Sequence, residues 1–206
     1  MAISYPLSMP AALNHRSYVV SADFAVGRSV SPYTYDNQIQ EYEGDAWALS
    51  VSLAPMNREA AEPWIGFLLA LHGVKGTFYW FDPLGTAPQG IATGTPLLNG
   101  ANQSGQTLLT KGWTISQTGI MKAGDWFSIS GYNSLYKVMQ DANSDGSGLA
   151  TLEIFPSLRS DAIADETALD LSSAQGIFRL SDGQNKIFSV DGRGAYLIGF
   201  NAVEAL

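Results

Sequence analysis

The sequence predicts a mainly β protein with one α-helix. Three observations support this fold class: several short stretches alternate apolar and polar residues, one stretch has helical spacing, and 21 glycines and 9 prolines supply many turns. A period of two is typical of half-buried strands, and apolar residues three and four apart are typical of a helix. With 206 residues, 46% of them hydrophobic, the chain can bury a proper core.

Two alternating stretches come before the helix. In residues 18–26 the apolar residues at even positions face one side of a predicted strand. Residues 47–53 repeat the pattern, with Trp47, Leu49 and Val51 facing one way. We therefore expect two half-buried strands.

The next stretch predicts the helix, at about residues 57–72. Its apolar stripe consists of Ala60, Trp64, Phe67, Leu68 and Leu71. Asn57 can cap the start, and Gly73 suits the C-terminal exit. Pro63 either bends a helix that begins at Asn57 or marks where its regular part begins.

The rest of the chain predicts further strands. Aromatic residues on both faces of a strand at 76–81 suggest that both faces are covered, and residues 82–106 have the composition of a linker into a second unit. Strands follow near 113–115, 126–130, 135–139 and 149–155, and residues 156–176 are polar and irregular. Two final alternating segments, 186–190 and 196–200, flank a turn at 191–194.

These stretches resemble the distal tail proteins of long-tailed, siphovirus-type bacteriophages and related minor tail proteins. In the first unit the likeness lies in the strand at 47–53, Pro-Met-Asn-Arg at 55–58, the helix bearing Trp64, Phe67 and Leu71, Gly73, and Gly-Thr-Phe-Tyr-Trp-Phe-Asp-Pro at 76–83. In the second it lies in Ala-Gly-Asp-Trp at 123–126, Leu-Tyr-Lys-Val at 135–138, Asp-Gly-Ser-Gly at 145–148, Ala-Thr-Leu-Glu-Ile at 150–154, Pro-Ser-Leu-Arg at 156–159 and Phe-Arg-Leu at 178–180.

The resemblance implies a fold and a role. It implies a ring-forming β-sandwich or barrel domain, residues 1–90 plus 181–206, with an inserted small β-barrel of the OB type at 91–180. Such proteins form a hexameric ring at the virion tail tip, assembled in the host cytoplasm. The expected partners are copies of the chain itself, the tail tube protein, and hub and fibre proteins, with DNA only passing through the lumen. Residues 1–16 would be an arm that extends a neighbour's sheet.

Composition disfavours several other classes. The chain has 11 Lys and Arg against 19 Asp and Glu, a formal charge of −8, which disfavours general nucleic-acid binding. It has no cysteine for disulfides or thiolate metal sites. The start does not resemble a secretory signal, and the longest apolar stretch, 64–71, is too short for membrane insertion.

The sequence offers weak signals for catalysis or cofactor binding. His15 is expected in a loop and His72 at a helix end, where a histidine usually faces the favourable end of the dipole. We expect no enzyme activity, no catalytic residues, and no metal or other cofactor.

One segment resembles the start of a calcium loop. Asp141, Asn143 and Asp145 alternate, and Gly146 follows. The acid required at loop position twelve is missing, because Leu152 stands there with Glu153 beside it. A polar hairpin is the preferred interpretation.

Two acidic groups are interpreted as solvated segments. Glu41, Glu43 and Asp45 precede a strand, and a carboxylate pair could hydrolyse sugars only if a cleft set the two groups at a suitable distance. The second group consists of Asp161, Asp165, Glu166 and Asp170.

Four aromatic residues leave an alternative function open. Trp113, Trp126, Tyr132 and Tyr136 lie in the expected insertion. They either fill its core or stack on sugar rings, as in a carbohydrate-binding module that contacts the host surface. We favour the core.

Overall fold

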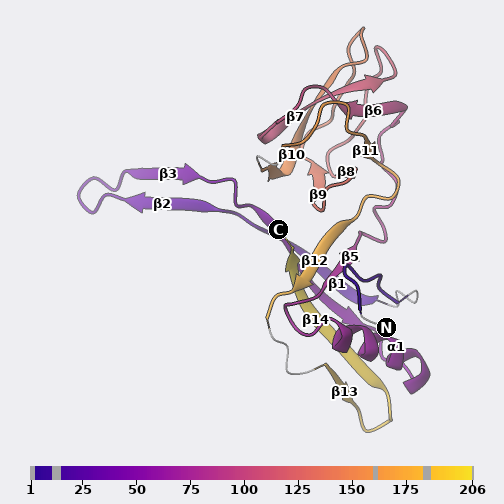
Figure 1. Ribbon diagram of the computed structural model, residues 1–206. Coiled ribbons are helices and arrows are strands. Elements are labelled where there is room, and N and C mark those ends of the chain that lie inside the picture. The colour runs from indigo at the N-terminus through magenta and orange to yellow at the C-terminus, as the bar shows by residue number, and fades with distance from the viewer. Residues whose placement is uncertain (1–2, 11–14, 160–161, 183–186, 206) are drawn as a thin grey trace. The chain divides into compact units, whose positions relative to one another are not determined.

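A computed structural model describes residues 3–10, 15–159, 162–182 and 187–205, with the backbone alone at 15 and 16. The described chain is mainly β with one α-helix, as predicted. It divides into two units, each built from separate segments (Figure 1). The first comprises 1–22, 47–82 and 175–206, and the second comprises 23–46 and 83–174.

The first unit is a sheet with the helix packed against it. The sheet order is β1-β4-β14-β12-β5, with β13 paired to β14. The elements are β1 (His15–Asp23), β4 (Ala46–Leu53), α1 (Arg58–Ala70), β5 (Thr77–Trp80), β12 (Gly176–Leu180), β13 (Phe188–Val190) and β14 (Tyr196–Glu204). The strand pairs β4–β14, β14–β12 and β12–β5 are antiparallel.

Aromatic side chains make the core of this unit. Phe67 of α1 packs against Trp64 of the same helix and against Phe78 of β5, with ring centroids 5.5 Å apart for Phe67 and Phe78, and Phe78 in turn packs against Phe178 of β12. All four are buried. The alternation at 47–53 is confirmed, because Trp47, Leu49, Val51 and Leu53 are all buried in β4.

The helix begins and ends close to the predicted residues. Asn57 caps it, because its Oδ1 accepts the N–H of Ala60 at 3.0 Å. Pro63 lies inside the helix rather than at its start. After the helix, His72 and Gly73 both adopt positive φ, and the N–H of Gly76 donates to the carbonyl of Leu71 at 2.8 Å. Glycine accommodates such a turn most easily.

The described part of the expected N-terminal arm pairs within its own unit. The N–H of Leu7 donates to the carbonyl of Thr77 at 2.8 Å, and the N–H of Tyr79 donates to the carbonyl of Leu7 at 3.0 Å. Leu7 thus lies parallel to β5 at the edge of the sheet. At Leu7 the main-chain groups bond within the chain's own unit, and the contact of the arm with a neighbour's sheet stays a prediction.

The second unit contains a nearly closed six-stranded barrel. Its order is β11-β8-β9-β10-β7-β6, and all pairs are antiparallel. The elements are β6 (Gly94–Leu98), β7 (Gly105–Trp113), β8 (Trp126–Ile129), β9 (Leu135–Val138), β10 (Ala150–Leu158) and β11 (Leu169–Asp170). A bridge between Leu97 and Ala168 joins β6 to the residue before β11 and so brings the two ends of the sheet together.

The barrel encloses its own core, separate from that of the first unit. Leu98, Leu108, Phe127, Leu152 and Ile154 are among its fully buried side chains. The second unit also contains the strands β2 (Val26–Val30) and β3 (Asn37–Glu41), which form a separate two-stranded sheet.

Several boundaries differ from the expected ones. The expected strand at 18–26 is two strands, because β1 ends at Asp23 and the N–H of Ala25 turns away to the carboxylate of Asp45. The segment 82–106, expected as a linker, already contains β6 and the start of β7, and the strand expected near 113–115 ends at Trp113. Polar residues in these short strands hid the alternation.

The domain boundaries 1–90 plus 181–206 and 91–180 are likewise displaced. Residues 178–180, expected in the insertion, lie in β12, which pairs with β5 through Phe178 and Phe78 and with β14 through Leu180 and Ala202. Residues 23–46, expected in the ring domain, group with the second unit. Pairing partners far away in the sequence decide both assignments.

Candidate assembly surface

The β2–β3 hairpin has no further strand beside it. Its register runs from Val26 opposite Glu41 to Val30 opposite Asn37, and within the described residues neither strand pairs elsewhere (Figure 1). A lone two-stranded hairpin is marginally stable in water. The hairpin therefore lacks the supporting layer that each of the other two sheets has.

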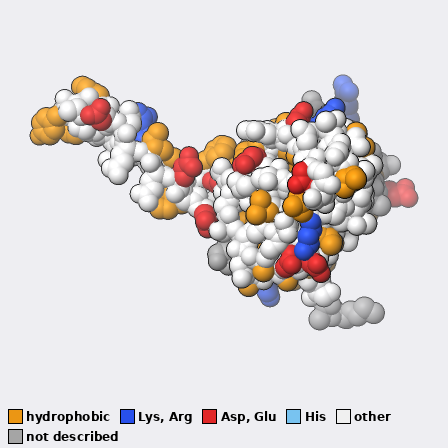
Figure 2. Space-filling model, turned by 90° about the horizontal axis from the view of Figure 1, so that it is seen from above, with side chains coloured by type: hydrophobic (Ala, Val, Ile, Leu, Met, Phe, Trp, Pro, Cys, Tyr) orange, Lys and Arg blue, Asp and Glu red, His pale blue; other side chains and the backbone are white. Residues whose placement is uncertain are grey.

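Large hydrophobic side chains on this hairpin are exposed. They are Phe24, Val26, Val30, Tyr33, Tyr35, Ile39 and Tyr42. Figure 2 shows orange side chains gathered over the hairpin at the left of the view. Tyr33 is 92% exposed, Tyr35 77% and Ile39 63%. Because a fully exposed aromatic side chain offers roughly 150–250 Å², we estimate the total at about 800 Å², one partner's share of a standard protein interface.

The tip of the hairpin, residues 31–36, is a defined turn. The N–H of Ser31 donates to the carbonyl of Asp36 at 3.0 Å, and the N–H of Tyr35 donates to the carbonyl of Ser31 at 3.0 Å. The hydroxyl oxygen of Ser31 also accepts the N–H of Thr34 at 3.3 Å. This turn holds Tyr33 and Tyr35 outward at the end of the hairpin.

A polar cluster holds the base of the hairpin to the barrel. The buried carboxylate of Asp45 accepts the N–H of Ala25 at 2.9 Å and the hydroxyl of Ser157 in β10 at 3.2 Å. Arg159 donates to the carbonyls of Asp45 at 2.6 Å and of Glu43 at 3.1 Å. Both backbone entry points of the hairpin are therefore bonded to β10 or to one another.

This cluster revises the interpretation of one acidic group. Glu41 and Glu43 are exposed, as expected of a solvated segment, but Asp45 is buried and structural. All the hydrogen bonds given above for Asp45 come from groups that close the base of the hairpin. Glu41, Glu43 and Asp45 all line one hollow at the base of the hairpin, but both carboxylate oxygens of Asp45 already accept these structural hydrogen bonds.

Both histidines belong to the first unit. The backbone of His15 begins β1, so the loop expected there is wrong. His72 is exposed in the turn after α1, as expected. The described side chains contain no group of three or more His, Asp or Glu able to hold a metal.

In the segment resembling a calcium loop, the side-chain oxygens accept hydrogen bonds from backbone N–H groups. Oδ1 of Asp145 accepts the N–H groups of Leu149 at 2.9 Å and Ser147 at 2.7 Å, and these bonds lower the pKa of its carboxyl group. Oδ1 of Asn143 accepts the N–H of Gly119 at 2.7 Å, and Oδ1 of Asp141 accepts the N–H of Ala123 at 2.9 Å. The segment is built as a polar connection between β9 and β10.

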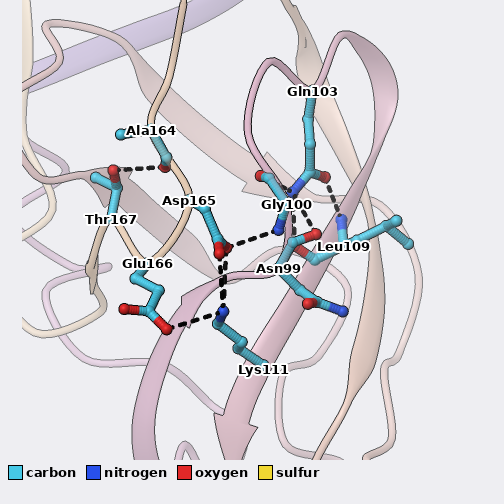
Figure 3. Close-up of polar contacts among 9 residues, drawn as sticks. All are labelled: Asn99, Gly100, Gln103, Leu109, Lys111, Ala164, Asp165, Glu166 and Thr167. Atoms are coloured by element: carbon cyan, nitrogen blue, oxygen red, sulfur yellow. Dashed lines mark hydrogen bonds and ion pairs between the residues drawn. The ribbon is translucent and has the colours of Figure 1, made fainter.

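Part of the second acidic group ties the barrel together. Figure 3 shows the ammonium group of Lys111 between Asp165, at 3.0 Å, and Glu166, at 3.2 Å. The N–H of Gly100 donates to Asp165 at 2.8 Å, and this bond, with Lys111, lowers the pKa of the Asp165 carboxyl group. The side chain of Asp170 accepts from Ser173, and Asp161 lies outside the described residues.

Three of the four aromatic residues considered for sugar stacking are buried. Trp113 donates its indole N–H to Thr110 at 2.8 Å inside the barrel, and Tyr136 stacks on Phe127 with ring centroids 5.4 Å apart. Trp126 is buried with Lys137 over its ring. Tyr132 is half-buried. The preferred interpretation, that these residues fill the core of the barrel, is confirmed for Trp113 and Tyr136, and Tyr132 packs against that core.

The net charge of the chain belongs to the second unit. The first unit has six Lys and Arg and six Asp and Glu, and the second has five and thirteen. The whole formal charge of −8 therefore lies on the unit that carries the barrel and the hairpin.

Fold and surface together define a mainly β protein of two interleaved units with an uncovered hairpin. No protein-family model matches the chain, and no curated protein matches it. Within the described residues, no helix is long and apolar enough to cross a membrane.

Proposed function

We propose that the chain is a non-enzymatic structural protein of a bacteriophage tail tip. In this proposal copies close into a hexameric ring that joins the tail tube to the hub and fibres. The resemblance in sequence suggests the setting. The observation that carries the proposal is the β2–β3 hairpin, whose hydrophobic side chains are exposed at both its tip and its strands.

The hairpin supports assembly because a partner would bury its exposed hydrophobic side chains. Large exposed apolar surfaces on soluble proteins usually mark interaction sites, and the hairpin exposes seven large hydrophobic side chains within one short segment. A ring is built from head-to-tail contacts, in which each subunit offers two different patches to its neighbours. A hairpin fixed at its base and uncovered at its tip is suited to be one of them.

The charge distribution supports a passage for DNA. An acidic surface repels the phosphate backbone, so a ring whose lumen is lined by the second unit lets DNA pass without binding it. A basic inner wall in an assembled ring would contradict this part of the proposal.

The alternative, a carbohydrate-binding module, loses its main support. It depended on aromatic side chains of the barrel, and Trp113, Trp126 and Tyr136 are buried. Binding of the full chain to a glycan array would revive it.

Electron microscopy of the full chain tests the proposal, with and without the tail tube protein of the same phage. We expect six-fold rings, alone or stacked on the end of the tube. Tyr33→Ser should reduce ring formation, whereas Val19→Ser, at an exposed position of β1, should not. A chain that stays monomeric at high concentration in the presence of the tube protein would contradict the proposal.

A further inference from the structure

The first unit carries an apolar hollow beside the C-terminal end of α1. Its lining includes Leu68, Leu69, His72, Leu180, Ile187 and Phe200, and we call it the α1–β14 hollow. Its volume is about 210 Å³. A cavity of about 150 Å³ lined by apolar side chains is large enough to bind benzene. The hollow can therefore hold one aromatic ring.

The surface around the hollow is also apolar. Leu69 is 54% exposed, and Val74 and Phe188 are exposed as well. A second hollow, lined by Phe188 and Leu197, shares Ile187 and Gly199 with the first. The apolar surface thus extends beyond the space for a single ring.

The tip of the hairpin carries aromatic side chains of the kind that can fill this apolar hollow. Tyr33 and Tyr35 are rigid aromatic side chains with a polar end, the type enriched at the centres of protein interfaces. The charges also match, because Asp36 is the only charged residue of the tip and Lys75 lies exposed in the turn that contains His72. The area of the hairpin is that of one side of a stable interface.

We propose that the tip of the hairpin of one copy docks in the α1–β14 hollow of a second copy. One tyrosine ring enters the hollow, the other covers Leu69, and Asp36 lies beside Lys75. This inference deepens the proposed function and rests on it. Each copy has one tip and one hollow, which are the two different patches that a closed ring requires.

Disulfide crosslinking tests the contact cleanly, because the chain has no cysteine of its own. Tyr35→Cys and Leu69→Cys chains with different tags are mixed with tail tube protein and oxidised. A matched control replaces Leu69→Cys by Val19→Cys, a position of the same unit with 57% exposure against 54%. We expect at least about tenfold more disulfide-linked dimer with Leu69→Cys than with the control, the factor that one hot-spot contact provides.

A charge exchange gives a second measurement. Asp36→Lys in the Tyr35→Cys chain should lower the yield of the Leu69→Cys dimer, and Lys75→Asp in the partner chain should restore it. All of these positions are exposed, so the variants should keep the melting temperature of the parent chain.

Two results would overturn the inference. They are equal yields with Leu69→Cys and with the control, and no restoration by the double exchange. Electron microscopy of the same samples separates the two proposals: rings without the Tyr35–Leu69 bond overturn this contact alone, and the absence of rings overturns the proposed function.

Discussion

Trp64→Ala tests whether α1 faces the sheet through its largest side chain. Trp64 is 1% exposed, and its ring centroid lies 5.9 Å from that of Phe67 and 6.4 Å from that of Phe200. Replacing a buried tryptophan by alanine removes its transfer free energy and leaves a cavity, which costs about 3–5 kcal/mol of unfolding free energy. For a chain of this size, 1 kcal/mol shifts the melting temperature by about 2–4 °C. We therefore expect a fall of about 6–20 °C.

Thermal unfolding followed by circular dichroism measures this change. Leu69→Ala is the control, because Leu69 lies on the opposite, exposed face of the same helix. That substitution should change the unfolding free energy by no more than about 0.5 kcal/mol. An unchanged melting temperature for Trp64→Ala, or an equal fall for Leu69→Ala, would refute the packing described for α1.

Four further predictions concern polar groups. Asp45→Ala removes the acceptor for both groups at the base of the hairpin; we expect a loss of about 1–3 kcal/mol and faster amide hydrogen exchange at residues 24–42, whereas Asp36→Ala should leave the exchange at the base unchanged. Burial and a hydrogen bond to a carboxylate raise the pKa of Tyr18 to about 12. The stability that Tyr18 contributes is thus complete below pH 10 and lost as the pH rises toward 12; an absorbance titration should show one late tyrosine that Tyr18→Phe removes. The pKa of Asp165 is lowered from 3.8, so the ionised Asp165 stabilises the fold above that pH, and this stabilisation is lost as the pH falls through the lowered value. Measured by urea unfolding, the Asp165→Asn chain should therefore lose less stability between pH 5 and pH 3 than the parent chain. Calorimetric titration with calcium should give no binding heat, because Asp145 already accepts backbone N–H groups; a saturable heat would contradict this.

Local patterns predicted the elements that bury one face. The helix was found because its apolar stripe and the Asn57 cap lie within one short segment, and β4 because Trp47, Leu49 and Val51 alternate without interruption. In both elements one face is buried, and a buried face appears in the sequence as regularly spaced apolar residues.

Long-range pairing could not be predicted in the same way. Phe178 looked like the end of the inserted barrel, and its place opposite Phe78 depends on a partner about a hundred residues away in the chain. The alternation of β7 is also hidden, because the polar residue Thr110 is buried in it and the apolar residue Leu109 is exposed.

The hairpin surface was missed although the sequence carries a signal for it. Val26 and Val30, then Ile39, flank a turn that begins at Ser31 and contains Pro32, a pattern typical of a β-hairpin. What the sequence could not show is that no third strand covers it. The role of Asp45 was equally hidden, because Ser157 and Arg159 follow it by more than a hundred residues.

The interleaved path of the chain has a consequence for how the molecule can be altered. The backbone passes between the two units four times, so neither unit can be removed as one continuous segment. Excising residues 83–174 would remove Ser157 and Arg159 together with the barrel. Asp45 would then lose the hydrogen bonds that it forms with these two residues. Gain or loss of the barrel alone, without a change in the hairpin, is therefore a poor route for engineering or evolution of this chain.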